Sequence, residues 1–163
     1  MIVLGIDPGK KGALVALGRD DHRVSLASSY YAGRHLVPSL LVEALRRMRA
    51  DLGAGDAVVV VEAQQSMPRQ GVSSTFATGL NYGRILGAVE TMGWPLHVLR
   101  AREWRKLAGI TVGKRADPKA ATIAEVSRRL PDLDLTPGRC RVAQDGIADA
   151  AGMALAGRVI VGG

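Results

Sequence analysis

The sequence predicts an α/β fold in which a mixed five-stranded sheet is flanked by helices. Three short apolar stretches open the chain, and two further ones alternate with stretches whose apolar residues recur at helical spacing. Three consecutive strands followed by strand–helix units are typical of a mixed sheet with helices on its faces. The expected strands are residues 1–7, 12–18, 23–30, 57–62 and 95–99, and the expected helices are residues 35–50, 73–93, 101–108, 118–130 and 142–160.

Length and composition indicate one globular domain over residues 1–163. The chain is 47% hydrophobic, and a domain of this size buries about 68–70% of its unfolded surface. Its net charge of +7 favours a polyanionic partner such as nucleic acid, or an anionic surface.

The compartment follows from what the sequence lacks. Cys140 is the single cysteine, so neither a disulfide framework nor a cysteine zinc site is expected, which favours a reducing compartment. No uncharged apolar run reaches about 18 residues, and no charged segment precedes the first apolar run, so we expect no membrane partner and no signal peptide.

Four acidic residues stand out by their positions. Asp7 and Glu62 each follow directly on an apolar strand, and in a sheet that pairs these strands in parallel the two side chains lie side by side. Asp145 and Asp149 are four residues apart on one face of an otherwise small and apolar helix, so they lie about 6 Å apart along its axis. Like charges placed near a core are costly unless a cation lies between them.

Four carboxylates without histidine or cysteine suit Mg²⁺, which prefers oxygen ligands and substrate phosphate. Two such ions about 3.5–4 Å apart can hold the attacking and leaving oxygens of a phosphodiester. Each acid alone has a structural explanation. Asp7 could form an Asx turn with Pro8 and Gly9, Glu62 could be a solvated strand-end charge, and Asp145 could interact with the helix dipole. Asp149 lies inside an apolar helix, so the joint pattern favours a metal site.

At this point the sequence resembles a known family. The segments GIDPGKKGALVAL, VVVVEAQQSMPRQGVSSTFATGLNYGRILGAVE, REWRKLAGI, KRADPKAATIAEVSRRLPD and DGIADAAGMALAG are similar, in order, to the RuvC-type Holliday junction resolvases, in particular the small phage-type branch. The resemblance implies an RNase H-like fold, a homodimer, and Mg²⁺-dependent nicking of two opposed strands of a four-way DNA junction.

By motif, the resemblance matches Asp7, Glu62, Asp145 and Asp149 to the family's catalytic and metal-binding acids. It implies two Mg²⁺ ions per site, for which Mn²⁺ is expected to substitute, and a bacterial cytoplasmic protein, with a phage-encoded one equally compatible. One departure is the spacing of the last acid pair. The cellular branch spaces it by three residues, whereas here it is four, so cellular sequence preference cannot be transferred.

Several basic residues are candidate DNA contacts. Lys10 and Lys11 lie in the turn beside Asp7, and Lys114, Arg115 and Lys119 flank a helix start, where an N-terminus also attracts anions. For each of them, solvated surface charge is an equal alternative.

Phe76, the single phenylalanine, follows the polar segment QGVSS downstream of Glu62. It could act as a wedge that stacks between junction bases or as a core residue that packs its helix on the sheet. Trp94 and Trp104 are expected in the core. The stripe formed by Gly79, Gly83 and Gly87 predicts close packing of this helix on the sheet or on a second subunit.

Other functions remain open at the sequence level. One is a nuclease of the same fold that cuts RNA–DNA hybrids, flaps or branched DNA generally. Another is a junction-binding protein without cleavage, against which the presence of all four acids argues. An actin-like ATPase also begins with a GIDPG phosphate turn, but that architecture needs two such domains.

Overall fold

The centre of the molecule is a five-stranded mixed sheet, as the sequence predicts. The computed structural model describes residues 1–9, 11–65 and 71–162. In it the strands are ordered β3-β2-β1-β6-β7 across the sheet. Their bounds are β1 Ile2–Ile6, β2 Ala13–Leu17, β3 His22–Leu26, β6 Ala57–Glu62 and β7 Leu96–Leu99.

The pairing of the strands decides which ends meet. β1 is antiparallel to β2 and parallel to β6, and β6 is parallel to β7. In the β1–β6 register Ile6 lies opposite Val61. The next residue on each strand is acidic, so Asp7 and Glu62 leave the sheet together at the same edge.

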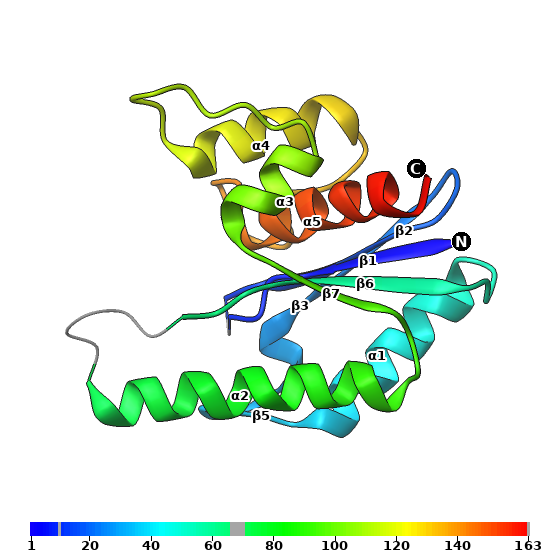
Figure 1. Ribbon diagram of the computed structural model, residues 1–163, viewed down its shortest axis with the longest axis vertical. Coiled ribbons are helices and arrows are strands. Elements are labelled where there is room, and N and C mark those ends of the chain that lie inside the picture. The colour runs from blue at the N-terminus through cyan, green and yellow to red at the C-terminus, as the bar shows by residue number, and fades with distance from the viewer. Residues whose placement is uncertain (10, 66–70, 163) are drawn as a thin grey trace.

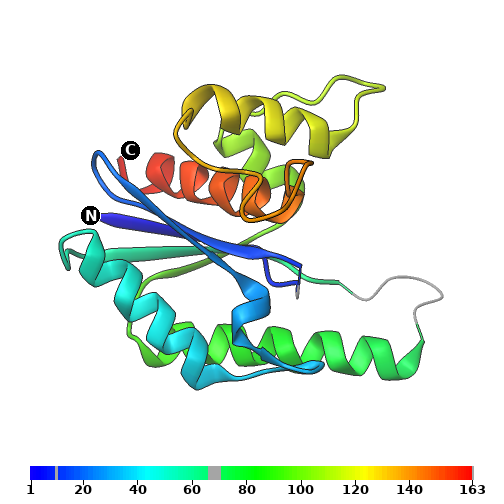
Figure 2. The ribbon, with the colours of Figure 1, turned by 180° about the vertical axis from the view of Figure 1, so that it is seen from behind.

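The helices form a layer on each face of the sheet (Figures 1 and 2). One layer contains α1 and α2, and the other contains α3, α4 and α5 around the red C-terminal helix of Figure 1. The helix bounds are α1 Pro38–Asp51, α2 Val72–Thr91, α3 Ala101–Leu107, α4 Pro118–Arg129 and α5 Asp145–Gly162.

Strand alternation gives each layer its own core. On β1, Ile2, Leu4 and Ile6 belong to the cluster with α1 and α2, whereas Val3 belongs to the cluster with α5. Every residue of β1 is buried, as expected for a central strand that is covered on both faces.

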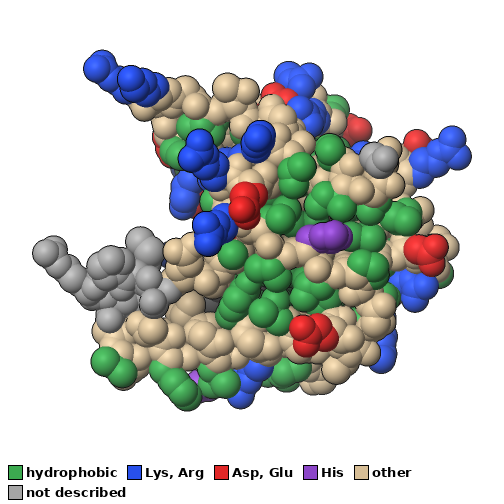
Figure 3. Space-filling model, in the orientation of Figure 1, with side chains coloured by type: hydrophobic (Ala, Val, Ile, Leu, Met, Phe, Trp, Pro, Cys, Tyr) green, Lys and Arg blue, Asp and Glu red, His purple; other side chains and the backbone are tan. Residues whose placement is uncertain are grey.

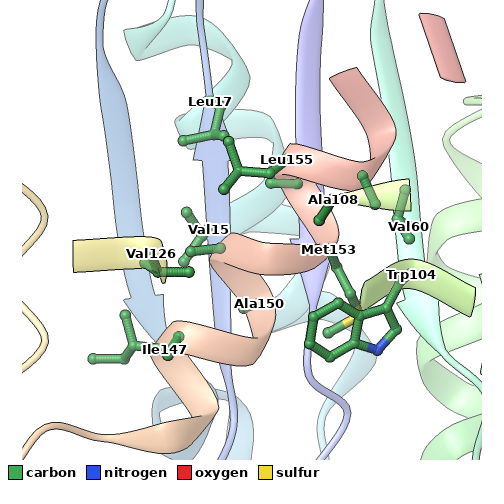
Figure 4. Packing of buried hydrophobic residues seen from close by; sticks show 14 of the residues in the cluster. Val15, Leu17, Val60, Trp104, Ala108, Val126, Ile147, Ala150, Met153 and Leu155 are labelled. Carbon is green, nitrogen blue, oxygen red and sulfur yellow. The ribbon is translucent and has the colours of Figure 1, made fainter. Parts of the chain in front are cut away.

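Helix α5 lies unusually close to the sheet because small residues line the contact. A β-carbon added at Gly5 of β1 would overlap the backbone of Ala150, and one added at Gly157 would overlap the side chain of Val3. Figure 4 shows Ala150 and Met153 of α5 facing the sheet and Trp104 beside Met153. These glycines fix how deeply the start of α5, with its two acids, approaches the end of β1.

Three predicted boundaries were wrong. The helix expected over residues 35–50 begins at Pro38, because His35 and Leu36 pair with the preceding strand as β5. The strand expected over residues 23–30 ends at Leu26, and Ala27–Tyr30 forms a 3₁₀ turn. Leu26 pairs with Ala13, the first residue of β2, so the ladder offers no further partner. The last helix begins at Asp145, three residues later than expected, and the Gln144 carbonyl accepts its first backbone hydrogen bonds.

A small hairpin between the 3₁₀ turn and α1 escaped the sequence reading. Its strands are β4 Tyr31–Ala32 and β5 His35–Leu36, and Gly33 supplies the positive φ of 61° that the tight turn needs. The strands have two residues each, which is too short to show a hydrophobic alternation.

The tryptophans and the glycine stripe gave mixed outcomes. Trp104 is fully buried, as expected, but Trp94 is only half-buried. A β-carbon at Gly79, Gly83 or Gly87 would meet nothing within 4 Å. The expected close packing of this stripe on the sheet was therefore wrong, because the stripe lies on the outer side of α2.

No helix in the described part of the chain combines the length and hydrophobicity needed to cross a bilayer.

Candidate active site

The turn after β1 holds Asp7 at the edge of the sheet. The Asp7 backbone N–H donates to the Ala13 carbonyl at 3.0 Å, and the Gly12 N–H donates to the Gly9 carbonyl at 2.9 Å. A β-carbon at Gly12 would overlap the backbone of Asp7. The glycine therefore lets the turn fold tightly against the acid that precedes it.

The first turn of α5 packs directly on this segment. A β-carbon at Gly146 would lie 2.6 Å from the Lys11 carbonyl oxygen and 3.0 Å from Asp7 Oδ2. Gly146 thus allows the flanking Asp145, and Asp149 one turn later, to approach Asp7. The structure brings the four predicted acids, Asp7, Glu62, Asp145 and Asp149, to one place.

The electrostatics of the cluster show crowded negative charge. Burial raises the pKa of Asp7 to about 7, and the negative charges of Asp149 and Glu62 add to this effect. Burial also raises the pKa of Asp149 to about 6, although Arg105 opposes the shift. Two carboxyl groups that hold protons near neutral pH are a signature of functional sites more often than of solvated surface.

Two cations pair with the α5 acids. Arg105 Nη2 of α3 lies 3.5 Å from Asp149 Oδ1. The Arg105 side chain is 15% exposed and that of Asp149 is 16% exposed. The same guanidinium donates through Nε to Thr122 Oγ1 at 3.2 Å and stacks 4.5 Å from the centre of the Trp104 ring. Lys119 of α4 donates to Asp145 Oδ2 and holds the pKa of Asp145 below its usual value.

Glu62 has a different partner. The indole Nε1 of Trp104 donates to Glu62 Oε2 at 2.8 Å. The sequence reading placed Trp104 in the core without this polar contact, and it did not single out Arg105 at all. No pattern within α3 reveals either contact, because both depend on how α3 packs against the end of β6 and against α5.

The donor set fits a hard divalent cation. All four acids offer carboxylate oxygens, the ligands that such an ion prefers, and burial raises the pKa of Asp7 and of Asp149. Across residues 1–9, 11–65 and 71–162, no three acidic, histidine or cysteine side chains already have metal-ligating geometry. Lys119 pairs with Asp145 Oδ2 and Arg105 with Asp149 Oδ1, so both cations compete with an ion for these carboxylates.

The candidate DNA contacts are distributed around these acids. Lys10 lies outside the described residues, whereas Lys11 is exposed and, with Asp145, lines a groove of about 600 Å³. Lys114 and Arg115 are exposed in the loop before α4. At the α4 N-terminus the side chain of Asp117 caps the helix and accepts from the Lys119 N–H at 3.0 Å, so an anion that binds there would have to replace this cap.

Phe76 lies on the outer side of α2 and is 71% exposed. The core alternative for this residue is therefore wrong. One turn earlier Val72 is 88% exposed, so the first part of α2 presents two apolar side chains beyond the edge of the sheet.

Basic side chains gather near the acids on one face of the molecule. Figure 3 shows lysine and arginine side chains over α3 and over the loop before α4. A groove of about 610 Å³ runs through this region, with Arg102, Arg105 and Lys106 in its lining. This surface offers positive potential next to the carboxylates, as a phosphate backbone requires.

Comparison with known proteins identifies the fold. The sequence matches no family model and no curated protein. Two structures of RuvC from Thermus thermophilus superpose on 99% of this chain and 95% of their own, each with a TM-score of 0.62, at 19% and 20% identity. The chain has the RuvC fold.

One of these RuvC structures is a complex with a Holliday junction substrate. The yeast mitochondrial Holliday junction resolvase Ydc2 is more distant, with a TM-score of 0.41 and 14% identity over 94% of this chain and 76% of its own. The RuvC fold is the RNase H-like α/β architecture that the motifs implied, so the predicted fold class is confirmed.

Proposed function

We propose that the protein is a metal-dependent endonuclease that resolves four-way DNA junctions by paired nicks in two opposed strands. The observation that carries this proposal is the convergence of Asp7, Glu62, Asp145 and Asp149 from β1, β6 and α5 on one edge of a RuvC fold. The net charge of +7 and the basic side chains beside these acids support a DNA substrate.

The four acids would hold two Mg²⁺ ions, with Mn²⁺ as a functional substitute. When bound, such ions lower the pKa of a water nucleophile and stabilise the leaving oxygen of a phosphodiester. The chain itself prepares the ligands. The Trp104 indole fixes the direction of the Glu62 carboxylate, and the tight turn at Gly12 holds Asp7 against the start of α5.

Arg105 and Lys119 have a second role in this proposal. Each is paired with a carboxylate of α5, so each can transfer its hydrogen bonds to a DNA phosphate when that carboxylate turns to an ion. Charge-assisted contacts of this kind hold the phosphate in position without requiring a histidine base.

The remaining DNA contacts extend the proposal over the surface. Lys10, Lys11, Lys114 and Arg115 would contact backbone phosphates, and Phe76 would stack on bases where the junction opens. Two symmetric cuts require two active sites related by a twofold axis. We therefore propose a homodimer in which the stripe of Gly79, Gly83 and Gly87 packs against its partner, in a bacterial cytoplasm where branched DNA is accessible.

The deciding experiment compares substrates. Purified protein is incubated with Mg²⁺ and end-labelled four-way junctions, three-way junctions, flaps, duplexes and RNA–DNA hybrids, and the nicks are mapped. Asp7→Asn protein, prepared in parallel, reports contaminating nucleases. We expect symmetric nicks in opposed strands of the four-way junction. Preferential cutting of flaps or hybrids would assign a different nuclease activity to the same site, and binding without any cutting would indicate a junction-binding protein.

A further inference from the structure

A groove of about 720 Å³ opens beside the carboxylates on the α2 side of the sheet. One end is formed by Pro8 and Gly9, which directly follow Asp7, and by Gln64, two residues after Glu62. Its walls are the β4–β5 hairpin and the first half of α2. The groove is therefore continuous with the candidate active site, and we name it the Tyr31 groove.

The lining of the Tyr31 groove is aromatic and polar with little charge. Volumes of this size accommodate a group as large as a nucleotide. Two phenol rings, several hydroxyl and amide side chains and one cation contribute, and none of the described lining residues is acidic. These side chains are Tyr31, Tyr82, Ser73, Ser74, Thr78, Gln64, Asn81 and Arg34.

Tyr31 connects the groove to the catalytic acids. Its hydroxyl donates to the Pro8 carbonyl at 3.4 Å. Burial raises the pKa of Tyr31, and the negative charge of Asp7 raises it further. The phenol therefore lies close enough to Asp7 to respond to its charge, and a molecule that stacks on Tyr31 lies next to whatever the acids hold.

The hairpin wall is held in place by α2. Asn81, which is 8% exposed, accepts from the Leu36 N–H at 3.0 Å and donates to the Arg34 carbonyl at 2.8 Å. Arg84 donates to the Leu36 carbonyl at 3.0 Å. These bonds fix the hairpin that carries Tyr31 before any ligand arrives, which lowers the entropic cost of binding.

We propose that the Tyr31 groove receives an unstacked base of the cut DNA strand, close to the phosphate held at the carboxylates. This inference rests on the proposed function and deepens it, because contacts to that base would give the enzyme a nucleotide preference at the cut site. Single-stranded bases are recognised by stacking on aromatic rings and by hydrogen bonds to their edges, which is the chemistry of this lining. A duplex backbone would require more cations than Arg34 alone.

The experiment uses a series of four-way junctions, each with one abasic nucleotide at a different position of the cut strand on either side of the mapped nick. Binding of each junction is measured in EDTA and single-turnover cleavage in Mg²⁺. For the wild type we expect one position, adjacent to the nick, at which the abasic site lowers binding or cleavage about 10-fold. Tyr31→Leu should lower binding or cleavage of the intact junction to the level that the wild type shows with the abasic junction. In this variant the abasic site should cause no further loss.

Two more variants control for structure. Tyr31→Phe keeps the ring and removes the bond to Pro8, so the abasic penalty should persist. Ser73→Met fills the groove from α2 without altering the hairpin and should remove the penalty even if Tyr31→Leu folds poorly by thermal melting. Normal junction binding with no abasic penalty at any position, or a penalty unchanged in both Tyr31→Leu and Ser73→Met, would overturn this inference alone. Failure of the wild type to bind junctions would overturn the proposed function and this inference together.

Discussion

The indole of Trp104 holds the carboxylate of Glu62, with Nε1 donating to Oε2 at 2.8 Å across 42 positions of sequence. Trp104 is fully buried against α5 and β6, so its N–H has a fixed direction. The hydrophobic core thereby sets the orientation of one candidate metal ligand. The Arg105 guanidinium, which pairs with Asp149, lies over the ring of the same tryptophan, so one side chain contacts the partners of two of the four acids.

Replacing Trp104 by Phe should separate these roles. Trp104→Phe keeps a ring for the core and for Arg105 but removes the donor to Glu62. Loss of a hydrogen bond that orients a metal ligand typically costs 10–100-fold in metal affinity or activity, so we expect weaker Mn²⁺ binding by calorimetry and slower cleavage. Trp94→Phe, at a half-buried tryptophan outside the site, is the matched control. Wild-type Mn²⁺ affinity in Trp104→Phe would show that the contact is only structural.

Removing the charge of Asp7 should abolish cleavage and spare DNA binding. Asp7→Asn eliminates a central carboxylate of the cluster, whereas binding depends on basic side chains and phosphate contacts distributed over the surface. Cleavage assays and mobility shifts on the same junction measure the two properties. Asp20→Asn, at an exposed carboxylate of the β2–β3 turn, should change neither. Equal cleavage by Asp7→Asn and the wild type would disprove the assignment.

The sequence predicted that the four acids lie close together, because their positions follow from short-range periodicity. Apolar runs that end on Asp7 and Glu62 need only parallel pairing to bring the two together, and the β1–β6 register provides it. The i, i+4 spacing of Asp145 and Asp149 likewise places both on one helix face. These regularities extend over a few residues, so they are visible in one sequence.

The contacts that tune the site could not be predicted in this way. The pairing of Lys119 with Asp145 depends on how α4 packs on α5, and the contact of Arg105 with Asp149 depends on how α3 does so. The sequence shows which face of a helix is apolar but not the angle at which two helices meet. The requirement for glycine at position 146 is also visible only in the structure, because a side chain there would collide with Lys11 and Asp7.

Stability in the absence of divalent ions should fall as the pH rises toward neutrality. The pKa of Asp7 is raised to about 7 and that of Asp149 to about 6. Between about pH 4 and 7 the native protein therefore holds more protons at these groups than the unfolded chain, and the free energy of unfolding decreases with pH. Asp145 has a lowered pKa, so its opposite contribution changes only at more acidic pH.

Melting curves in EDTA test this dependence. The melting temperature of the wild type should fall between about pH 4 and 7, and Asp7→Asn should flatten the decrease. Mg²⁺ should raise the melting temperature more at the higher pH, because ligand carboxylates must lose their protons to bind it. A decrease of equal size in the wild type and Asp7→Asn would locate the titration elsewhere.

The glycine stripe on α2 gives a test of the proposed homodimer. Gly83 is exposed, and a β-carbon there meets nothing within 4 Å of this chain. Gly83→Gln should therefore stabilise the isolated fold by up to about 1 kcal/mol, because Gly is a poor helix former. If α2 packs on a partner, the same side chain blocks the contact, and light scattering should show a monomer. Ala124→Gln, on an exposed position of α4, should leave the oligomeric state unchanged. A dimer that survives Gly83→Gln would exclude the stripe as its interface.

Phe76 should matter for the junction and not for the fold. A fully buried phenylalanine costs about 3–5 kcal/mol when truncated to alanine, but Phe76 is 71% exposed, so Phe76→Ala should leave the melting temperature nearly unchanged. A side chain that stacks on opened bases contributes about 1–3 kcal/mol, so the same variant should bind or open four-way junctions about 5- to 150-fold less well, while duplex binding, which is electrostatic, changes little. Titrations of both substrates at one fixed salt concentration measure this difference, and 2-aminopurine at the crossover reports base opening directly. Phe76→Trp should bind the junction as well as the wild type does, and Phe76→Leu should keep only part of this binding, since both side chains are apolar but only tryptophan stacks. Val159→Ala, at a half-exposed apolar residue near the C-terminal end of α5, serves as the control for loss of exposed apolar surface. Equal loss of junction and duplex binding in Phe76→Ala would reject base stacking and leave the exposed ring as a general contact surface.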